Sequence, residues 1–450
     1  MNSENTSGVD TQPSSGPRLA RTLGLFALTI YGIGDMLGSG IYALIGKAAG
    51  LMGNAIWAAF LVSMLAALRT GLSYASLGSR YPRAAGAAYV THRAYRRQFL
   101  SYVIGLAVMA SGLTSMATQS RAFSGYFAGL VGSVPAPVII IGFVLALSFV
   151  NFWGMRESSW LNLVCTSVEV CGLAIIIAVG ARFLGGVNYF ELPAAPEGTV
   201  VLPVLLGGAV LTFYSFLGFE DMINIIEEVK EPRRTFPRAV VLALLVTTCL
   251  YVLVSLTAVS VVPHAELAQS DEPLVEVVRR AAPAFPTGLF SFIALFAITN
   301  TALLNYIMGS RLAYGMAEQG LLPRWLGAVH PVRRTPHVAI GVLMVIVLAL
   351  ALIGNLKSLA AATSVLLLCV FIVINVALVI LKRRPGEPAG QFEVPTAVPV
   401  VGALVCAALL LNAKPEAFAI AGALLVGIVV LYFVLRPEAL GEDELTAVDA

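Results

Sequence analysis

The chain has 450 residues, of which 58% are hydrophobic and only 12% are charged. Soluble domains carry about 25% charged residues, so this chain lacks the charge that a water-facing surface of its size needs. The composition excludes a soluble globular enzyme, a nucleic-acid-binding protein and a disordered scaffold. It indicates a polytopic membrane protein whose surroundings are lipid.

Cysteines and histidines give no sign of a metal or redox site. All five cysteines fall inside apolar runs without a CxxC pair, and the four histidines lie in polar connections. We therefore interpret the cysteines as small buried apolar residues. The chain also has no GxxxxGK[ST] motif, so we expect no bound nucleotide, no cofactor, no metal and no enzymatic activity.

Twelve apolar runs are long enough to span a membrane as helices, which need about 20 residues. Such runs are too long for the strands of a barrel. They cover residues 23–46, 54–78, 99–129, 136–155, 159–184, 201–226, 239–262, 284–315, 336–354, 358–381, 395–412 and 416–435. We expect an all-α membrane protein, flanked by tails at 1–20 and 437–450.

The distribution of basic residues orients these spans. Of the 28 lysines and arginines, 20 fall in the segments on the side of the N-terminus and six in the segments on the opposite side. The remaining two, Arg69 and Arg121, lie inside spans. Cytoplasmic loops are enriched in Lys and Arg, so we expect both termini in the cytoplasm of a cell that carries this protein in its inner or plasma membrane.

Two of the spans contain residues that disfavour a continuous helix. Residues 32–41 of the first span include four glycines, and residues 213–221 of the sixth include Gly218, Glu220 and Asp221. Paired interruptions at corresponding places in two halves are typical of transporters with inverted repeats. The alternative interpretation is that the glycines only permit close helix packing.

Interrupted helices expose peptide groups that must face a cavity or a ligand in lipid surroundings. Free N–H groups at a helix start attract a carboxylate, and free carbonyls attract an ammonium. One interruption of each kind would form a receptor for a zwitterion.

Four ordered motifs resemble the amino acid–polyamine–organocation (APC) superfamily. They comprise residues 31–42, 73–86, 218–221 with 227–239, and 310–323, and the similarity runs from about residue 21 to 435. This resemblance implies a LeuT-type fold with broken helices 1 and 6. Its parts would be a first repeat of helices 1–5 at 21–200, a second repeat of helices 6–10 at 201–385, and peripheral helices 11 and 12 at 386–436.

The resemblance also implies which residues bind substrate. The carboxylate would bind at Gly38, Ser39 and Gly40. The amino group would bind backbone carbonyls on both helices. On helix 1 this is the carbonyl of Ile33, and on helix 6 these are the carbonyls of Phe216, Leu217 and Phe219, with Gly218 in the same binding segment. Tyr214 falls where related permeases have a gating aromatic ring.

Ionisable side chains inside spans are costly and suggest function. Glu169 stands where some proton-coupled relatives have a lysine, so it is a candidate proton carrier, or else a static partner for Arg121 or another buried donor. Glu220 stands where related exchangers have an acid that takes part in gating, although an anchoring role is also open.

Asp35 and Arg69 depart from the family pattern, which is uncharged at both positions. Asp35 lies one turn before Ser39, where it could contact a basic substrate side chain. Alternatively, Asp35 and Arg69 form an ion pair between helices 1 and 2, since each buried charge needs a partner. The charge of the substrate therefore stays open.

Together these features predict a secondary active transporter of amino acids that works by alternating access and is coupled to protons. An exchanger of polyamines or organic cations is the alternative within transport. A channel or a receptor that kept the fold is the alternative from another class.

Overall fold

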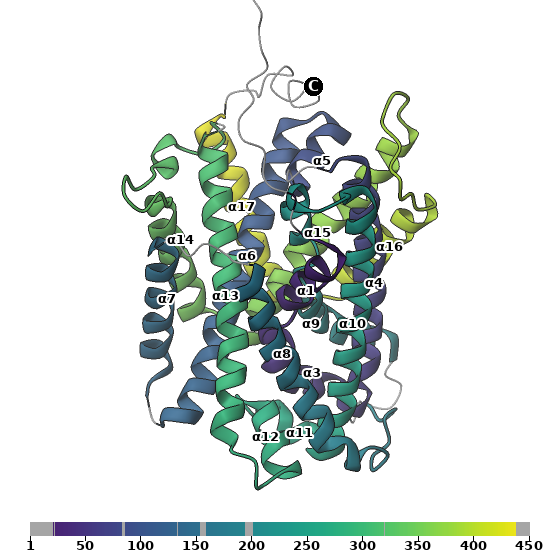
Figure 1. Cartoon of the computed structure of the whole chain (residues 1–450), viewed down its shortest axis with the longest axis vertical. Coiled ribbons are helices and arrows are strands. Elements are labelled where there is room, and N and C mark those ends of the chain that lie inside the picture. The colour runs from purple at the N-terminus through teal and green to yellow at the C-terminus, as the bar shows by residue number, and fades with distance from the viewer. Residues whose placement is uncertain are drawn as a thin grey trace, which may run out of the picture.

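The computed structural model of the chain describes residues 21, 23–82, 86–132, 134–153, 159–193, 201–318 and 320–437. Within these ranges the secondary structure is helical, and no β-strand forms. A single parallel bridge joins Leu23 to Val229. Most long helices run along the longest axis of the molecule (Figure 1).

The α-helices follow one another along the whole described chain. In order they are α1 (Leu25–Met36), α2 (Ser39–Tyr42), α3 (Leu44–Met52), α4 (Ile56–Arg80), α5 (Gly86–Tyr95), α6 (Gln98–Val131), α7 (Ala136–Trp153), α8 (Ser159–Gly180), α9 (Val201–Phe213), α10 (Pro232–Val261), α11 (His264–Gln269), α12 (Pro273–Ala281), α13 (Thr287–Glu318), α14 (His337–Ile353), α15 (Leu356–Arg383), α16 (Ala397–Leu411) and α17 (Pro415–Leu435).

Nine helical segments of the described chain are long and apolar enough to cross a membrane, and three further apolar helices, α1, α14 and α16, are shorter. Large apolar side chains remain exposed on the outer helices; Val345 of α14 and Phe433 of α17 are 62% and 65% exposed. Water disfavours so apolar a surface, whereas lipid chains do not. The chain is a multi-pass membrane protein.

Some boundaries differ from the sequence prediction. The apolar run at 23–46 is divided among α1, α2 and α3, and α3 continues to Met52. The connections at 79–98 and 263–283, which we expected to be loops, contain α5, α11 and α12. These helices are short and mix apolar with charged residues, so a search for long apolar runs does not find them.

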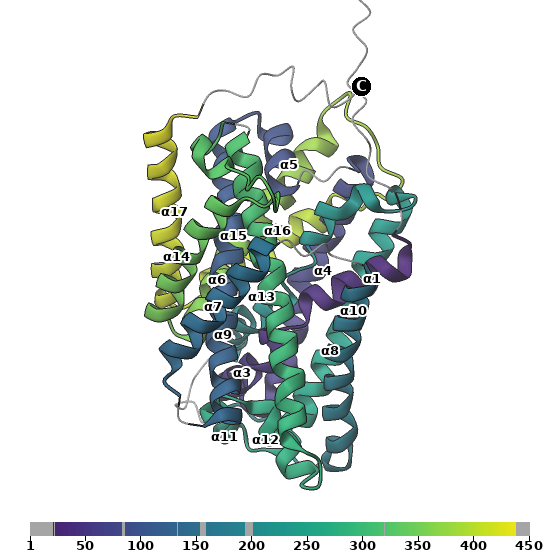
Figure 2. The ribbon, with the colours of Figure 1, turned by 60° about the vertical axis from the view of Figure 1, so that its left-hand side comes forward.

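The centre of the molecule is aromatic. Tyr42, Phe213, Phe216, Phe219 and Tyr251 are among the largest fully buried side chains. Figure 2 shows α14 and α17 on one flank and α1, α8 and α10 towards the other. Phe213, Phe216 and Phe219 lie in or next to the stretch where the helix that begins at Val201 loses regularity.

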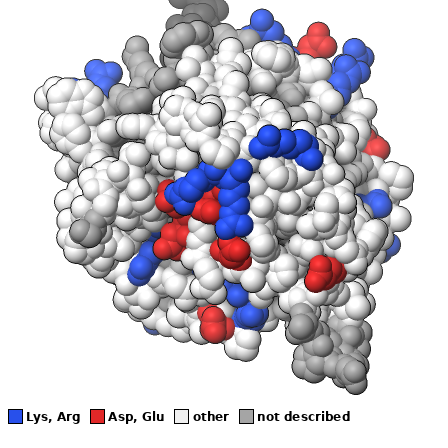
Figure 3. All heavy atoms as spheres, turned by 90° about the horizontal axis from the view of Figure 1, so that it is seen from below, with Lys and Arg blue, Asp and Glu red and all other residues white. Residues whose placement is uncertain are grey.

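Charged side chains gather at the two ends. The end with α11 and α12 carries adjacent acidic and basic side chains (Figure 3), among which Glu276 binds Arg279 at 2.5 Å and Arg280 at 3.1 Å. The opposite end carries α5 and the connection from α15 to α16 (Figure 1).

Candidate functional site

The first irregular segment lies between α1 and α2. Leu37 is extended, with φ −78° and ψ 115°, and Gly38 follows with φ −174° and ψ −146°. Helical hydrogen bonding therefore lapses, and side chains from other helices bind the carbonyls. Thr301 of α13 donates to the Leu37 carbonyl at 2.8 Å, and Tyr251 of α10 donates to the Met36 carbonyl at 2.7 Å.

The second irregular segment follows α9. A 3₁₀ turn covers Tyr214–Phe216, Leu217 is extended, and Gly218 adopts φ +121° before a second 3₁₀ stretch over Asp221–Glu228. A φ of this sign favours glycine, because other residues meet steric strain there. The Gly218 N–H donates to the Glu220 carboxylate at 2.9 Å, so Glu220 holds the turn that it follows.

These two segments touch each other. A β-carbon added to Gly40 would lie 2.6 Å from the Cα of Ser215, and one added to Gly218 would lie 2.8 Å from the carbonyl carbon of Asp35. Real β-carbons do not approach so closely, so both contacts require glycine. The structure thus brings together the two glycine motifs, which are about 180 residues apart in the sequence.

Tyr251 links both segments through one hydroxyl group. Its oxygen lies 2.7 Å from the carbonyl of Met36 and 2.7 Å from the carbonyl of Ser215. A tyrosine hydroxyl has a single hydrogen, so it can donate to only one of the two carbonyls at a time. Tyr251 can therefore exchange partners between the two segments without breaking a covalent or ionic contact.

Tyr214, the predicted gating residue, joins a hydroxyl network. Its hydroxyl lies 3.2 Å from Ser39 Oγ and 3.0 Å from Ser115 Oγ, and Gln119 Nε2 donates to Ser115 Oγ at 3.1 Å. Gln119 Oε1 is buried, and no partner for it occurs within the described ranges. An acceptor of this kind is available to a ligand's N–H or O–H group.

Glu169 lies on α8 and is fully buried. Asn300 of α13 donates to its Oε1 at 3.0 Å, while its Oε2 finds no hydrogen-bond partner among the residues that the structure describes. Thr166, one turn earlier, has an equally unpartnered hydroxyl that faces Gly34 of α1. A carboxylate with one open oxygen can accept a proton there, although its role as a proton carrier stays a prediction.

Arg121, the other predicted partner of Glu169, binds carbonyls at the end of α14. Its Nε donates to the Ala351 carbonyl at 2.5 Å and its Nη2 to the Leu352 carbonyl at 2.9 Å. These carbonyls end α14, where a cation is favourable. The buried donor beside Glu169 is therefore Asn300, and Arg121 acts as a cap.

Asp35 and Arg69 have different neighbours. Asp35 is 5% exposed and contacts Gly218 in the second irregular segment. The β-carbon of Arg69 lies beside Gly402 of α16. The ion pair between Asp35 and Arg69 stays a prediction, as does contact between Asp35 and a basic substrate.

The remaining predicted binding residues line the same region. Ile33, Phe216 and Phe219 are buried, and Leu217 is half-buried. The ring of Phe216 lies 5.3 Å from that of Tyr251. Their roles towards a substrate stay predictions.

Sequence reasoning missed the partners from the surrounding helices. Ser115, Gln119, Tyr251, Asn300 and Thr301 come from α6, α10 and α13. In the sequence these residues are recognisable only as polar side chains within apolar runs. Hydroxyl and amide residues are common in such helices, so only their positions in space single them out.

Comparison with known proteins agrees with this arrangement. Residues 23–436 match the family model for amino acid permeases. The chain belongs to this family. It is thus a member of the APC superfamily and a membrane transporter, not an enzyme.

Individual relatives cover most of the chain. A branched-chain amino acid permease of Bacillus subtilis is 29% identical over 88% of both chains. A methylthioribose transporter of the same organism is 28% identical over 87% of this chain and 88% of its own. Cationic amino acid transporter 4 of Mus musculus is 29% identical over 82% of this chain and 61% of its own.

Proposed function

We propose that this permease is a secondary active transporter that moves amino acids across the cell membrane by alternating access, coupled to protons. The observation that carries the proposal is the contact between the two irregular segments, at Gly40 with Ser215 and at Gly218 with Asp35. Two segments in which helical hydrogen bonding lapses, and which meet in a buried centre, can enclose a small zwitterion.

The helical segments support twelve membrane spans. The nine long segments and the three shorter apolar helices are compatible with twelve spans if α3, which one long segment joins to α4, is assigned to the first span. On this assignment α1 to α3 form a broken helix 1, and α9 with the following 3₁₀ turns forms a broken helix 6. Helices 1–5 and 6–10 would be the inverted repeats, and both termini would be cytoplasmic.

Amino acids are the proposed substrates because the family and two of the relatives above are named for them. The polar network of Tyr214, Ser115 and Gln119 supports a ligand with hydrogen-bonding groups. A cationic amino acid or a polyamine is the second candidate, because the Asp35 carboxylate is buried at the contact between the segments.

A ligand screen distinguishes these substrates. Purified protein is heated with each amino acid, with diamines and with methylthioribose, because a ligand that binds only the folded state raises the melting temperature. We expect branched-chain or cationic amino acids to raise it. Uptake into proteoliposomes should then saturate and be stimulated by substrate on the opposite side; a channel would show neither property.

Glu169→Gln tests proton coupling. The amide keeps the hydrogen-bonding shape but cannot take up a proton. We expect uptake driven by a proton gradient to fall at least tenfold, while exchange of substrate for substrate persists. Glu231→Gln, at an exposed carboxylate, is the control. Uptake in Glu169→Gln that still follows the proton gradient would remove Glu169 from the mechanism.

A further inference from the structure

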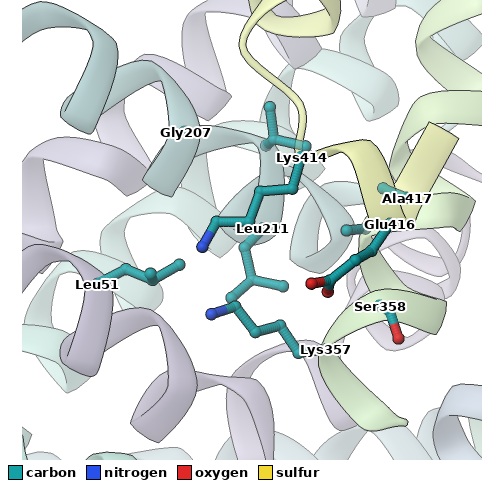
Figure 4. Close-up of a pocket in the computed structure, with 10 residues that line it drawn as sticks. Leu51, Gly207, Leu211, Lys357, Ser358, Lys414, Glu416 and Ala417 are labelled. Atoms are coloured by element: carbon teal, nitrogen blue, oxygen red, sulfur yellow. The ribbon is translucent and has the colours of Figure 1, made fainter. Parts of the chain in front are cut away.

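A small pocket lies at the junction of α3, α9, α15 and α17 (Figure 4). Its volume is about 20 Å³, and none of its lining residues belongs to the irregular segments. A water molecule needs roughly 10–15 Å³, so the pocket admits one or two oxygen-sized groups and is too small for an amino acid. It is therefore separate from the proposed transport site.

Three charged side chains converge on this pocket. Figure 4 shows the ammonium groups of Lys357 and Lys414 directed into the same space, with the Glu416 carboxylate at its other side. Within the described part of the chain, neither ammonium makes a hydrogen bond or an ion pair within 4.0 Å. Two cations that repel each other and one carboxylate leave a net positive charge for an anion to neutralise.

The two lysines are not needed to cap the start of α15. Asn355 already caps α15 by accepting a hydrogen bond from the Ser358 N–H at 2.9 Å. Lys47 of α3, a nearby cation, is bound to the carbonyl of Ala268 at 2.8 Å. Lys357 and Lys414 are thus the cations that remain for a ligand.

The position of the pocket fits a membrane boundary. Lys357 is the second residue of α15, and Lys414 directly precedes α17. Large apolar side chains of α17 are exposed from Phe418 to Val434, so this helix faces lipid along its length. Lysines at the ends of such helices reach the level of lipid headgroups.

We propose that Lys357 and Lys414 bind a phosphate group, supplied by a lipid headgroup or by free phosphate. One phosphate oxygen would enter the pocket between the two ammonium groups, while the rest of the group stays at its mouth. Two lysines around one phosphate are a strong electrostatic arrangement.

Binding there would affect the helices that contain the interruptions. The pocket is lined by Leu51 of α3 and by Gly207 and Leu211 of α9, while both lysines come from the α15 and α17 region. A phosphate bound by both lysines would tie the start of α15 to the start of α17, next to the apolar side chains of α3 and α9. It would stabilise the conformation in which they are packed as the structure shows them.

Melting temperatures of the full-length protein test the proposal. The protein is placed in nanodiscs of phosphatidylcholine with increasing phosphatidylglycerol, and separately titrated with inorganic phosphate in a detergent without phosphate. The Lys357→Gln/Lys414→Gln variant is compared with Lys230→Gln, an exposed lysine outside the pocket. Each lysine near a membrane surface changes anion affinity by roughly fivefold.

We expect the double variant to need about 25-fold more ligand for the same rise in melting temperature, while Lys230→Gln behaves as wild type. A response to phosphatidylglycerol alone identifies a lipid headgroup as the source, and a response to inorganic phosphate identifies the free anion. If the double variant and wild type respond equally to both ligands, the proposal is overturned. A cooperative melting transition of the double variant without ligand shows that it is folded.

Discussion

Two buried or half-buried regions of this permease are held together by different chemistry. At the contact between the irregular segments, neutral hydroxyl groups bind peptide carbonyls, as Tyr251 and Thr301 do. At the end with α5, ion pairs hold the segments together: Glu393 binds Arg80 at 2.6 Å and Lys382 at 2.6 Å. We call the second region, with Glu387 and its partner Arg93, the loop cluster.

The loop cluster fastens the connection from α15 to α16 onto α4 and α5. Arg93 binds Glu387 at 2.8 Å, and the N–H of Phe392 donates to Ser79 Oγ at 2.9 Å. Burial of Glu393 alone would raise its pKa, but hydrogen bonds from Arg80 and Lys382 outweigh burial and lower its pKa from 4.5 to about 2. The carboxylate therefore stays charged at neutral pH.

The difference between the regions follows from what each must do. A hydroxyl can pass from one acceptor to another without separating charges, so the centre can rearrange at a small electrostatic cost. An ion pair that separates in a half-buried place leaves charges to be hydrated again. We infer that the irregular segments move during transport while the loop cluster stays fixed.

The largest effect is expected from adding a methyl group where the segments touch. In Gly218→Ala the new β-carbon would meet the Asp35 backbone, and φ +121° is unfavourable for alanine. Overpacking costs about 1–3 kcal/mol, and we expect uptake to fall more than tenfold. Gly422→Ala in α17, where nothing lies within 4 Å, is the control and should transport normally. Normal uptake by Gly218→Ala would mean that the close contact is dispensable.

A smaller effect is expected from Tyr251→Phe, which removes the hydroxyl shared by Met36 and Ser215. A buried carbonyl without a donor costs about 1–3 kcal/mol, so both the melting temperature and the uptake rate should fall. Tyr102→Phe is matched to it, because the Tyr102 hydroxyl is buried without a partner among the described residues. Equal melting temperatures for the two variants would contradict the bridging role of Tyr251.

The smallest effect is expected in the loop cluster. Glu393→Gln should lower stability by about 1 kcal/mol, at the upper end for ion pairs that reach solvent, with uptake at neutral pH nearly unchanged. A depressed pKa stabilises the fold above pH 4.5, and this contribution is lost as pH falls towards about 2. Melting temperatures of wild type should drop over that range more than those of Glu393→Gln. Parallel curves would show that Glu393 does not carry this stability.

The sequence alone determined the class of the molecule. Apolar runs of about 20 residues and the low charge content define a helical membrane protein, because lipid leaves the backbone no other partner. The glycines at 32–41 and 213–221 likewise predicted where the helices become irregular, since glycine and paired acids oppose a continuous apolar helix. The family resemblance was also accessible, because it rests on ordered local motifs.

Only the tertiary structure decided which partners the polar and charged side chains within the helices contact. Arg121 caps α14, and Asn300 faces Glu169; the sequence offered Arg121 or another buried donor as the partner of that acid and could not choose between them. Tyr251 of α10 lies close to carbonyls of both irregular segments, and nothing in the sequence around Tyr251 predicts these contacts. A local pattern fixes hydrogen bonds between near neighbours, whereas contacts across more than a hundred residues depend on how the helices pack.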